Sequence, residues 1–208
     1  KGANMETIKC QIVKWEDIEK WVDDVVEKIR KSKYMPDVVV GLTRGGWIPA
    51  RLICDELQVK NLYAVKTEHW GLTATRDGQA KIAQPLAADV RGKNVLIVDD
   101  ITDTGQSLSL AKQHVESFEP KALKTATLLH ITHSIIVPDF YSVEVPKEEW
   151  TWFIFPWNFN EDIQSLVSKA LNDVRAAEEI KDVLKKHCQI AVDERVIYNA
   201  LLTLARKQ

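Results

Sequence analysis

Three carboxylates follow a run of apolar residues near the middle of the chain. Residues 95–98 are aliphatic, and Asp99, Asp100 and Asp103 come shortly after them. Residues 104–107 then form a short, hydroxyl-bearing turn at the start of an apolar-periodic segment. Carboxylates can hold sugar hydroxyls or a metal ion, and backbone N–H groups at the positive end of a helix suit a phosphate dianion. The run is therefore typical of a site for a sugar phosphate.

A second candidate anion site stands earlier in the chain, between a predicted strand and a predicted helix. It consists of Thr43, Arg44, Gly45 and Gly46. Two glycines let backbone N–H groups approach an anion closely, and the arginine supplies a permanent positive charge. Because a Gly-Gly pair alone usually marks a turn, this signal is weaker than the acidic run.

The elements that would position these residues alternate between strand and helix, which predicts a parallel α/β sheet. We expect helices over residues 15–30, 49–57 and 105–118, and strands over residues 38–40, 62–65, 95–98 and 124–129. Open α/β sheets bind their ligands at the carboxyl ends of the strands, where the acidic run falls. Neighbouring strand residues point to opposite faces, so the Asp99 and Asp100 carboxylates need not repel each other at close range.

Three further segments frame the predicted domain. Residues 67–89 are polar and lack a sustained period, so we expect a long loop there, of a length that is typical of functional or disordered segments. Residues 150–157 are rich in aromatic side chains, and the periodicity from residue 161 onward predicts three helices. We therefore expect one domain over residues 1–160, with a small hood around residues 130–160, and a helical C-terminal extension over residues 161–208.

The bulk composition argues against several classes of function. The net charge of −2 and the pI near 6.3 give no basic face for a nucleic acid or an anionic membrane. No apolar run approaches the roughly 20 residues that cross a bilayer. The three cysteines are scattered and odd in number, which is typical of thiols in a reducing cytoplasm, where we expect the protein to act.

The acidic run resembles the phosphoribosyl-pyrophosphate (PRPP) signature of type I phosphoribosyltransferases. Four apolar residues, two acids and two further residues precede an Asp-Thr-Gly sequence and a hydroxyl. The resemblance covers about residues 38–158 and implies an α/β fold with a central, mainly parallel sheet flanked by helices. It also implies PRPP and a purine base as substrates, Mg²⁺ as the cofactor and a homodimer as the assembly.

The resemblance assigns roles to the residues of the acidic run. Asp99 and Asp100 would contact the ribose hydroxyls and help to set the Mg²⁺ ion indirectly, through PRPP and water. Asp103 would be the catalytic residue, a general acid/base beside purine N7 while N9 attacks the anomeric carbon. Its alternative role is to cap the following helix. The loop for the 5′-phosphate would consist of Asp103, Thr104, Gly105, Gln106 and Ser107.

The resemblance also covers the pyrophosphate side of the reaction. Residues 43–46 resemble the pyrophosphate-binding loop of purine phosphoribosyltransferases, which often contains a non-proline cis peptide, here expected at Thr43–Arg44. Lys66, at the end of the next predicted strand, matches a basic position that serves the pyrophosphate. Residues 67–89 correspond to a mobile lid, with Arg76 and Lys81 as candidate contacts.

The aromatic run is the candidate for base recognition. Trp152 or Trp150 would cover the base, and residues 155–158 resemble a Pro-Trp-Asp stretch in which Asn158 replaces the aspartate. The residues that we expect to contact the base are Ile101, Ile131, Trp152, Phe153 and Asn158.

The identity of the base depends on one departure from the family pattern. Enzymes for 6-oxopurines carry a lysine just past the fourth strand, and Ile131 occupies that position, flanked by His130, Thr132 and His133. An ammonium group can only donate and would oppose the exocyclic amine of adenine, so its loss favours adenine. Ordinary adenine enzymes, however, have Ala-Thr-Gly in place of Asp103-Thr104-Gly105.

We therefore expect a purine phosphoribosyltransferase that uses adenine. Hypoxanthine, guanine or xanthine is the alternative acceptor. A third reading is a PRPP-sensing regulator without catalysis, but the acidic pI argues against a nucleic-acid partner.

Overall fold

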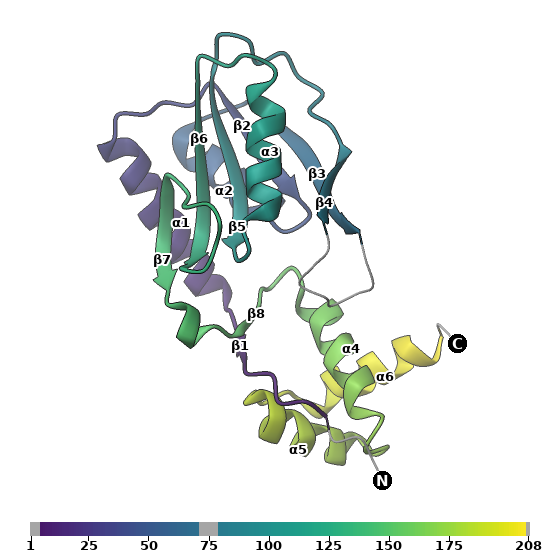
Figure 1. Ribbon diagram of the computed structural model, residues 1–208. Helices are drawn as coiled ribbons and strands as arrows, with labels where there is room; N and C mark the ends of the chain where they lie inside the picture. Colours follow the sequence, from purple (N-terminus) through teal and green to yellow (C-terminus); the bar gives the residue numbers. More distant parts are fainter. Residues whose placement is uncertain (1–4, 71–78, 207–208) are drawn as a thin grey trace. The chain divides into compact units, whose positions relative to one another are not determined.

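A six-stranded sheet forms the centre of the computed structural model, which describes residues 5–70 and 79–206 (Figure 1). The strand order is β4-β3-β2-β5-β6-β7, and every neighbouring pair is parallel except β3 and β4. The strands are β2 (Val38–Thr43), β3 (Leu62–Trp70), β4 (Gln79–Gln84), β5 (Asn94–Thr102), β6 (Ala122–Ile131) and β7 (Phe140–Val145). The expected α/β fold with a mainly parallel sheet is confirmed.

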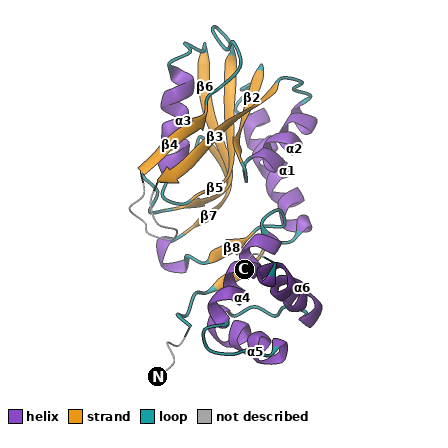
Figure 2. Cartoon of the chain, turned by 90° about the vertical axis from the view of Figure 1, so that its right-hand side faces the viewer, coloured by secondary structure: helices purple, strands orange, loops and turns teal. Residues whose placement is uncertain are grey.

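Helices cover both faces of this sheet. Figure 2 shows α3 (Gln106–Glu116) on one face, and α1 (Trp15–Lys31) and α2 (Trp47–Leu57) on the other. The core beneath α3 joins buried apolar residues of β2, β3 and β5 to Leu108, Ala111 and Val115 of that helix. The central strands are apolar on both faces because both faces are covered.

Two differences from the predicted elements concern the edges of the sheet. The expected loop over residues 67–89 is wrong in part, because β3 continues to Trp70 and β4 pairs with it in antiparallel fashion. Residues 140–145, which are not among the expected strands, form β7, a further parallel strand beside β6.

The contacts divide the chain into two compact units. The sheet unit is Glu16–Trp150, and the helical unit combines Lys1–Trp15 with Thr151–Gln208. The expected boundary between residues 160 and 161 lies inside helix α4 (Phe159–Ala170).

The helical unit joins segments from both ends of the chain. Strand β1 (Cys10–Ile12) pairs in parallel with β8 (Trp152–Ile154). Helices α4, α5 (Ala177–Cys188) and α6 (Glu194–Ala205) pack around a shared core that includes Ile154, Ile163, Leu184 and Ile197. A short 3₁₀ helix, η1 (Lys147–Glu149), precedes β8. The three helices expected after residue 161 are thus present.

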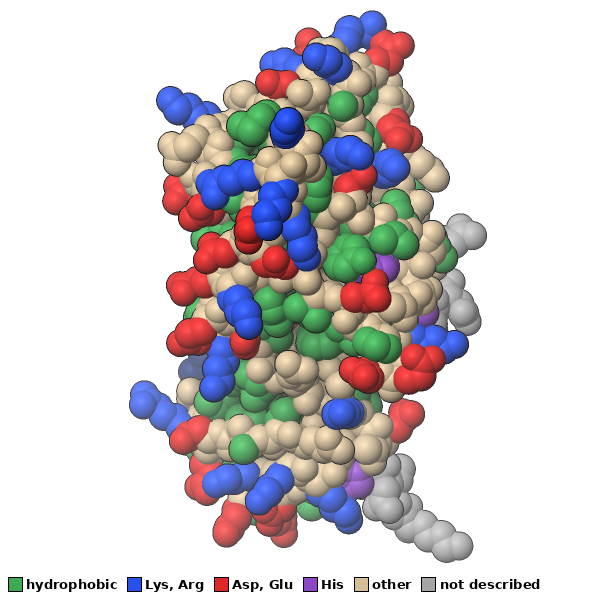
Figure 3. All heavy atoms as spheres, turned by 90° about the vertical axis from the view of Figure 1, so that its left-hand side faces the viewer, with side chains coloured by type: hydrophobic (Ala, Val, Ile, Leu, Met, Phe, Trp, Pro, Cys, Tyr) green, Lys and Arg blue, Asp and Glu red, His purple; other side chains and the backbone are tan. Residues whose placement is uncertain are grey.

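The surface shows no strong segregation of charge on the face drawn in Figure 3, where basic and acidic side chains are intermixed. This agrees with the small net charge of −2. Among the described residues, no helix is long and apolar enough to cross a membrane.

Candidate functional site

The acidic run lies at the carboxyl end of β5, a central strand of the sheet. Each of its first two carboxylates accepts a hydrogen bond from the next amide: Asp100 N–H donates to Asp99 Oδ1 and Ile101 N–H to Asp100 Oδ1, both at 2.9 Å. Such local bonds hold each carboxylate against the backbone of the residue that follows it. Burial raises the pKa of the Asp99 carboxyl well above its usual value, and the neighbouring Asp100 carboxylate raises it further. The expectation that opposite strand faces would keep these two carboxylates apart is therefore wrong.

The glycine loop, residues 43–46, packs directly against this strand end. A Cβ atom on Gly45 would collide with the carboxylate of Asp100. On Gly46 it would lie 2.6 Å from the Val98 carbonyl oxygen and 2.8 Å from the Asp99 Cα. The loop thus needs glycine at both positions in order to lie beside the acidic residues. The expected non-proline cis peptide at Thr43–Arg44 is confirmed.

The candidate pyrophosphate residues come from two neighbouring strands. Thr43 of β2 and Lys66 of β3 are paired in the parallel register, so the structure brings them together. Lys66 Nζ lies 2.6 Å from Glu68 Oε1, and the hydrogen bond from the Lys66 ammonium lowers the pKa of the Glu68 carboxyl. Arg44, within the glycine loop, is exposed. The candidate lid residue Arg76 lies outside the described residues, and Lys81 is on β4.

The candidate phosphate loop connects β5 to α3. Gly105 has a φ of +81°, a left-handed conformation that favours glycine, and it caps the helix that begins at Gln106. The first hydrogen bond of the helix is donated by Ser109 to the Gly105 carbonyl, at 2.9 Å. The amides before Ser109 have no carbonyl to bond within the helix, and the first turn contains no acidic residue. This end of the helix suits an anion.

Asp103 is held by two side chains from later parts of the chain. His133 Nε2 lies 2.6 Å from Asp103 Oδ1, and the Trp150 indole N–H donates to Asp103 Oδ2 at 3.3 Å. The Asp103 side chain remains 40% exposed, so it stays accessible to a ligand. Sequence reasoning did not identify these two contacts, although it considered Trp150 for the base and noted His133 beside Ile131.

The loop after β6 also contacts the phosphate loop through its backbone. The Ile135 N–H donates to the Thr104 carbonyl at 3.0 Å. A Cβ atom on Gly105 would collide with Ser134 Oγ, which shows how closely the two loops approach.

The expected base contacts are distributed over both units. Ile101 is partly exposed in the sheet unit, whereas Ile131 is fully buried at the end of β6 and offers no surface to a ligand. Trp152, Phe153 and Asn158 belong to the helical unit. Within that unit Trp152 packs against the helical core, and Asn158 is the N-cap residue that precedes α4.

Among the described residues, no group of three or more His, Cys, Asp or Glu side chains is arranged to hold a metal ion. Asp99 and Asp100 nevertheless supply hard carboxylate oxygens at one strand end. Mg²⁺ commonly binds one or two carboxylates, with water and substrate phosphate oxygens as its other ligands. The pair therefore fits an Mg²⁺ ion that arrives with a phosphorylated ligand.

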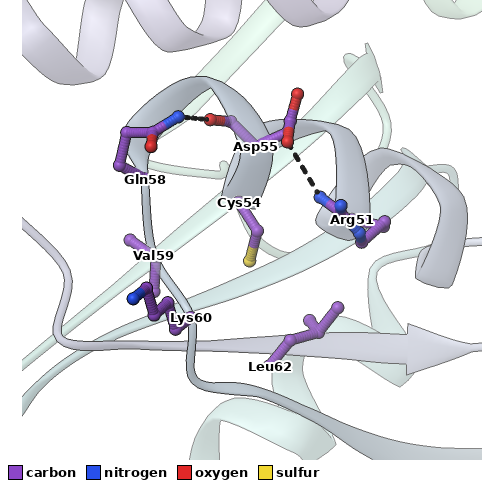
Figure 4. A pocket seen from close by; sticks show the side chains of 7 residues that line it. All are labelled: Arg51, Cys54, Asp55, Gln58, Val59, Lys60 and Leu62. Carbon is purple, nitrogen blue, oxygen red and sulfur yellow. Dashed lines mark hydrogen bonds and ion pairs between the residues drawn. The ribbon is translucent and has the colours of Figure 1, made fainter.

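A surface cavity of about 390 Å³ lies away from these residues, between the end of α2 and the start of β3 (Figure 4). Because β3 begins there, the cavity is at the opposite end of the sheet from the acidic run. Its polar groups bond one another: Arg51 pairs with Asp55 at 3.4 Å, and Gln58 donates to the Asp55 carbonyl at 2.6 Å. The carboxyl ends of the strands therefore remain the candidate functional site.

Known proteins resemble this chain over most of its described length. A family model described as a phosphoribosyl transferase domain matches residues 10–164. A hypoxanthine-guanine phosphoribosyltransferase of Aquifex aeolicus is 30% identical over 155 residues, which cover 70% of this chain and 85% of that protein. A hypoxanthine phosphoribosyltransferase of Escherichia coli is 37% identical over 117 residues, but the match spans only 65% of its length.

A solved structure supports the same relationship. The crystal structure of a purine phosphoribosyltransferase from Pyrococcus horikoshii has a TM-score of 0.62 and 30% sequence identity, and the match covers 72% of this chain and 94% of that one. Together with the family match over residues 10–164, this shows that the chain belongs to the phosphoribosyl transferase family.

Proposed function

We propose that the protein transfers a phosphoribosyl group from PRPP to N9 of a 6-oxopurine, hypoxanthine or guanine, and releases pyrophosphate. The observation that carries the proposal is the contact of the glycine loop with the acidic end of β5, beside the start of α3. Three kinds of binding group thus lie together at the carboxyl ends of the central strands. They are carboxylates that suit a ribose, a backbone loop that suits a pyrophosphate and a helix N-terminus that suits a phosphate.

The names of the relatives favour one of the two classes of base. The curated relatives from Escherichia coli and Aquifex aeolicus are named for hypoxanthine or for hypoxanthine and guanine. These names favour the 6-oxopurine alternative over the adenine preference expected from the missing lysine. Asp103, which ordinary adenine enzymes replace by alanine, agrees with the 6-oxopurine assignment.

In the proposed reaction, the residues at the carboxyl ends of the strands bind PRPP, the phosphoribosyl donor. Asp99 and Asp100 accept hydrogen bonds from the ribose hydroxyls, and the amides of residues 104–107 bind the 5′-phosphate. Arg44, Lys66 and the amides of Gly45 and Gly46 hold the pyrophosphate. Bound Mg²⁺ supplies positive charge that offsets the charge of the departing pyrophosphate.

The bond changes of the proposed transfer are balanced by one proton transfer. The N9 lone pair forms the bond to the anomeric carbon, and the bond from that carbon to the pyrophosphate oxygen breaks, with its electron pair leaving on the pyrophosphate. Asp103 accepts the proton that N7 loses, which restores a neutral purine ring.

The test is a direct assay of nucleotide formation. The protein is incubated with PRPP, Mg²⁺ and, in separate reactions, hypoxanthine, guanine, xanthine or adenine, and the nucleoside monophosphates are separated by chromatography. We expect inosine or guanosine monophosphate to form fastest. Faster formation of adenosine monophosphate would contradict the choice of base, and no nucleotide from any base would contradict the function itself.

A further inference from the structure

The Asp103 carboxylate has one donor on each oxygen, and both donors come from outside the PRPP signature. His133 contacts Oδ1 at 2.6 Å and Trp150 contacts Oδ2 at 3.3 Å. Each carboxylate oxygen has a second lone pair, so both can still accept another partner. We propose that His133 is a positioning residue, which fixes the Asp103 carboxylate in the orientation that accepts the purine N7 proton. This inference rests on the proposed function.

The geometry identifies His133 as the closer of the two hydrogen-bond partners of Asp103. Its 2.6 Å contact is short, as in charge-assisted hydrogen bonds to a carboxylate, whereas the Trp150 contact is longer by several tenths of an ångström. The Nε2–H tautomer is the one that donates to Asp103, and this bond fixes the position of the carboxylate.

The backbone on which His133 stands is itself fixed. The preceding strand ends at Ile131, whose carbonyl accepts a hydrogen bond from Ser134 N–H at 3.0 Å. On the other side, Ile135 N–H donates to the Thr104 carbonyl, also at 3.0 Å. The imidazole therefore approaches Asp103 from a segment that is bonded to the phosphate loop, unlike a flexible surface ion pair.

A purely stabilising role makes a different prediction from a positioning role. The side chain of His133 is 27% exposed and that of Asp103 is 40% exposed, and ion pairs with this exposure contribute little to stability. A misplacement of about 1 Å at a reacting group, however, can lower the rate by roughly 100-fold. Loss of His133 should therefore affect turnover much more than unfolding.

The kinetic test compares His133→Ala, His133→Gln and the control His187→Ala, which changes an imidazole of α5 in the helical unit. We expect His133→Ala to lower kcat by roughly 10- to 100-fold, with a much smaller change in the KM for PRPP and in Tm. His133→Gln keeps an N–H donor and should recover part of kcat. His187→Ala should match the unmodified protein.

A second test needs no turnover. In protein labelled with ¹⁵N-histidine, Asp103→Ala should shift the ring nitrogen signals of His133 and leave those of His187 in place. Unchanged His133 signals would overturn the proposal. So would a kcat of His133→Ala equal to that of the unmodified protein, or a loss in His133→Gln as large as in His133→Ala.

A failure of the proposed function would give a different result in these assays from a failure of this inference alone. In that case the unmodified protein would form no nucleotide from any of the four bases, and the catalytic part of this inference would fail with it. Active unmodified protein with an equally active His133→Ala variant would contradict this inference alone.

Discussion

At the scale of single residues, the proposed reaction depends on the group that accepts the purine N7 proton. Asp103 combines a 40% exposed carboxylate with fixed donors on both oxygens, a combination suited to a general base. We expect Asp103→Asn to lower kcat by about 10²- to 10⁴-fold, because an amide cannot accept the proton. The KM for PRPP should change far less. Initial rates at varied PRPP concentration measure both quantities.

The matched control is Asp182→Asn, the same substitution at an exposed position of α5. It should leave kcat and KM unchanged. A kcat of Asp103→Asn equal to that of the unmodified protein would remove Asp103 from the role of base.

A second prediction concerns Gly45, where a methyl group would meet the Asp100 carboxylate. Gly45→Ala should displace Asp100 or the loop, raise the KM for PRPP, and lower the free energy of unfolding by about 1–3 kcal/mol through overpacking. The control is Gly92→Ala, where a Cβ meets nothing within 4 Å but φ is +71°. That variant should lose stability through backbone strain alone and keep its KM. A Gly45→Ala variant with an unchanged KM would show that the contact has no role in donor binding.

At the scale of elements, β7 is attached to the sheet by the carboxylate of the residue that precedes it, Asp139, whose side chain is 28% exposed. Asp139 accepts hydrogen bonds from Lys124 Nζ at 2.9 Å and from Thr125 N–H at 2.8 Å. Burial alone would raise the pKa of Asp139, but these donors outweigh it and lower the pKa below its usual value. The folded state therefore binds the proton less tightly than the unfolded state, so the stabilisation is present above the ordinary pKa and is lost as the pH falls through the lowered one.

We expect Asp139→Asn to lower the free energy of unfolding by about 1–3 kcal/mol near pH 7. The difference from the unmodified protein should shrink below about pH 4, where the aspartate itself becomes protonated. Urea unfolding at pH 7 and at pH 3 measures this change. Asp55→Asn, at an exposed i,i+4 pair, should have almost no effect at either pH. A loss that is the same at both pH values would exclude the electrostatic cause.

Elements with a strong apolar period could be predicted from the sequence, and those at the sheet edges could not. The helix over residues 15–31 and the central strands bury regular apolar faces, which local patterns reveal. Strand β4 leaves most of its residues partly or fully exposed, so it lacks the apolar alternation of a half-buried strand. The contacts of Asp103 with His133 and Trp150 join residues 30 and 47 positions apart, and no local pattern carries such information.

At the scale of the whole molecule, the helical unit has its own core, which can be tested apart from the site. Leu184 is fully buried in that core, whereas Leu202 on α6 is 42% exposed. Leu184→Ala should lower the free energy of unfolding by about 2–5 kcal/mol, because it removes buried contacts and leaves a cavity. Leu202→Ala should change it by less than about 0.5 kcal/mol. Calorimetry of both variants measures these changes in the free energy of unfolding. Equal changes in the two variants would contradict the assignment of this core.

The pairing of β1 with β8 also sets an order of events during synthesis. These strands are separated by about 140 residues of chain. At about 5–20 residues per second, β1 leaves the ribosome on the order of ten seconds before its partner exists. The sheet unit is contiguous over Glu16–Trp150 and is complete before β8 is made, and small domains commonly fold within a second. Strand β1 is translated before the sheet unit but is therefore paired only after that unit has formed.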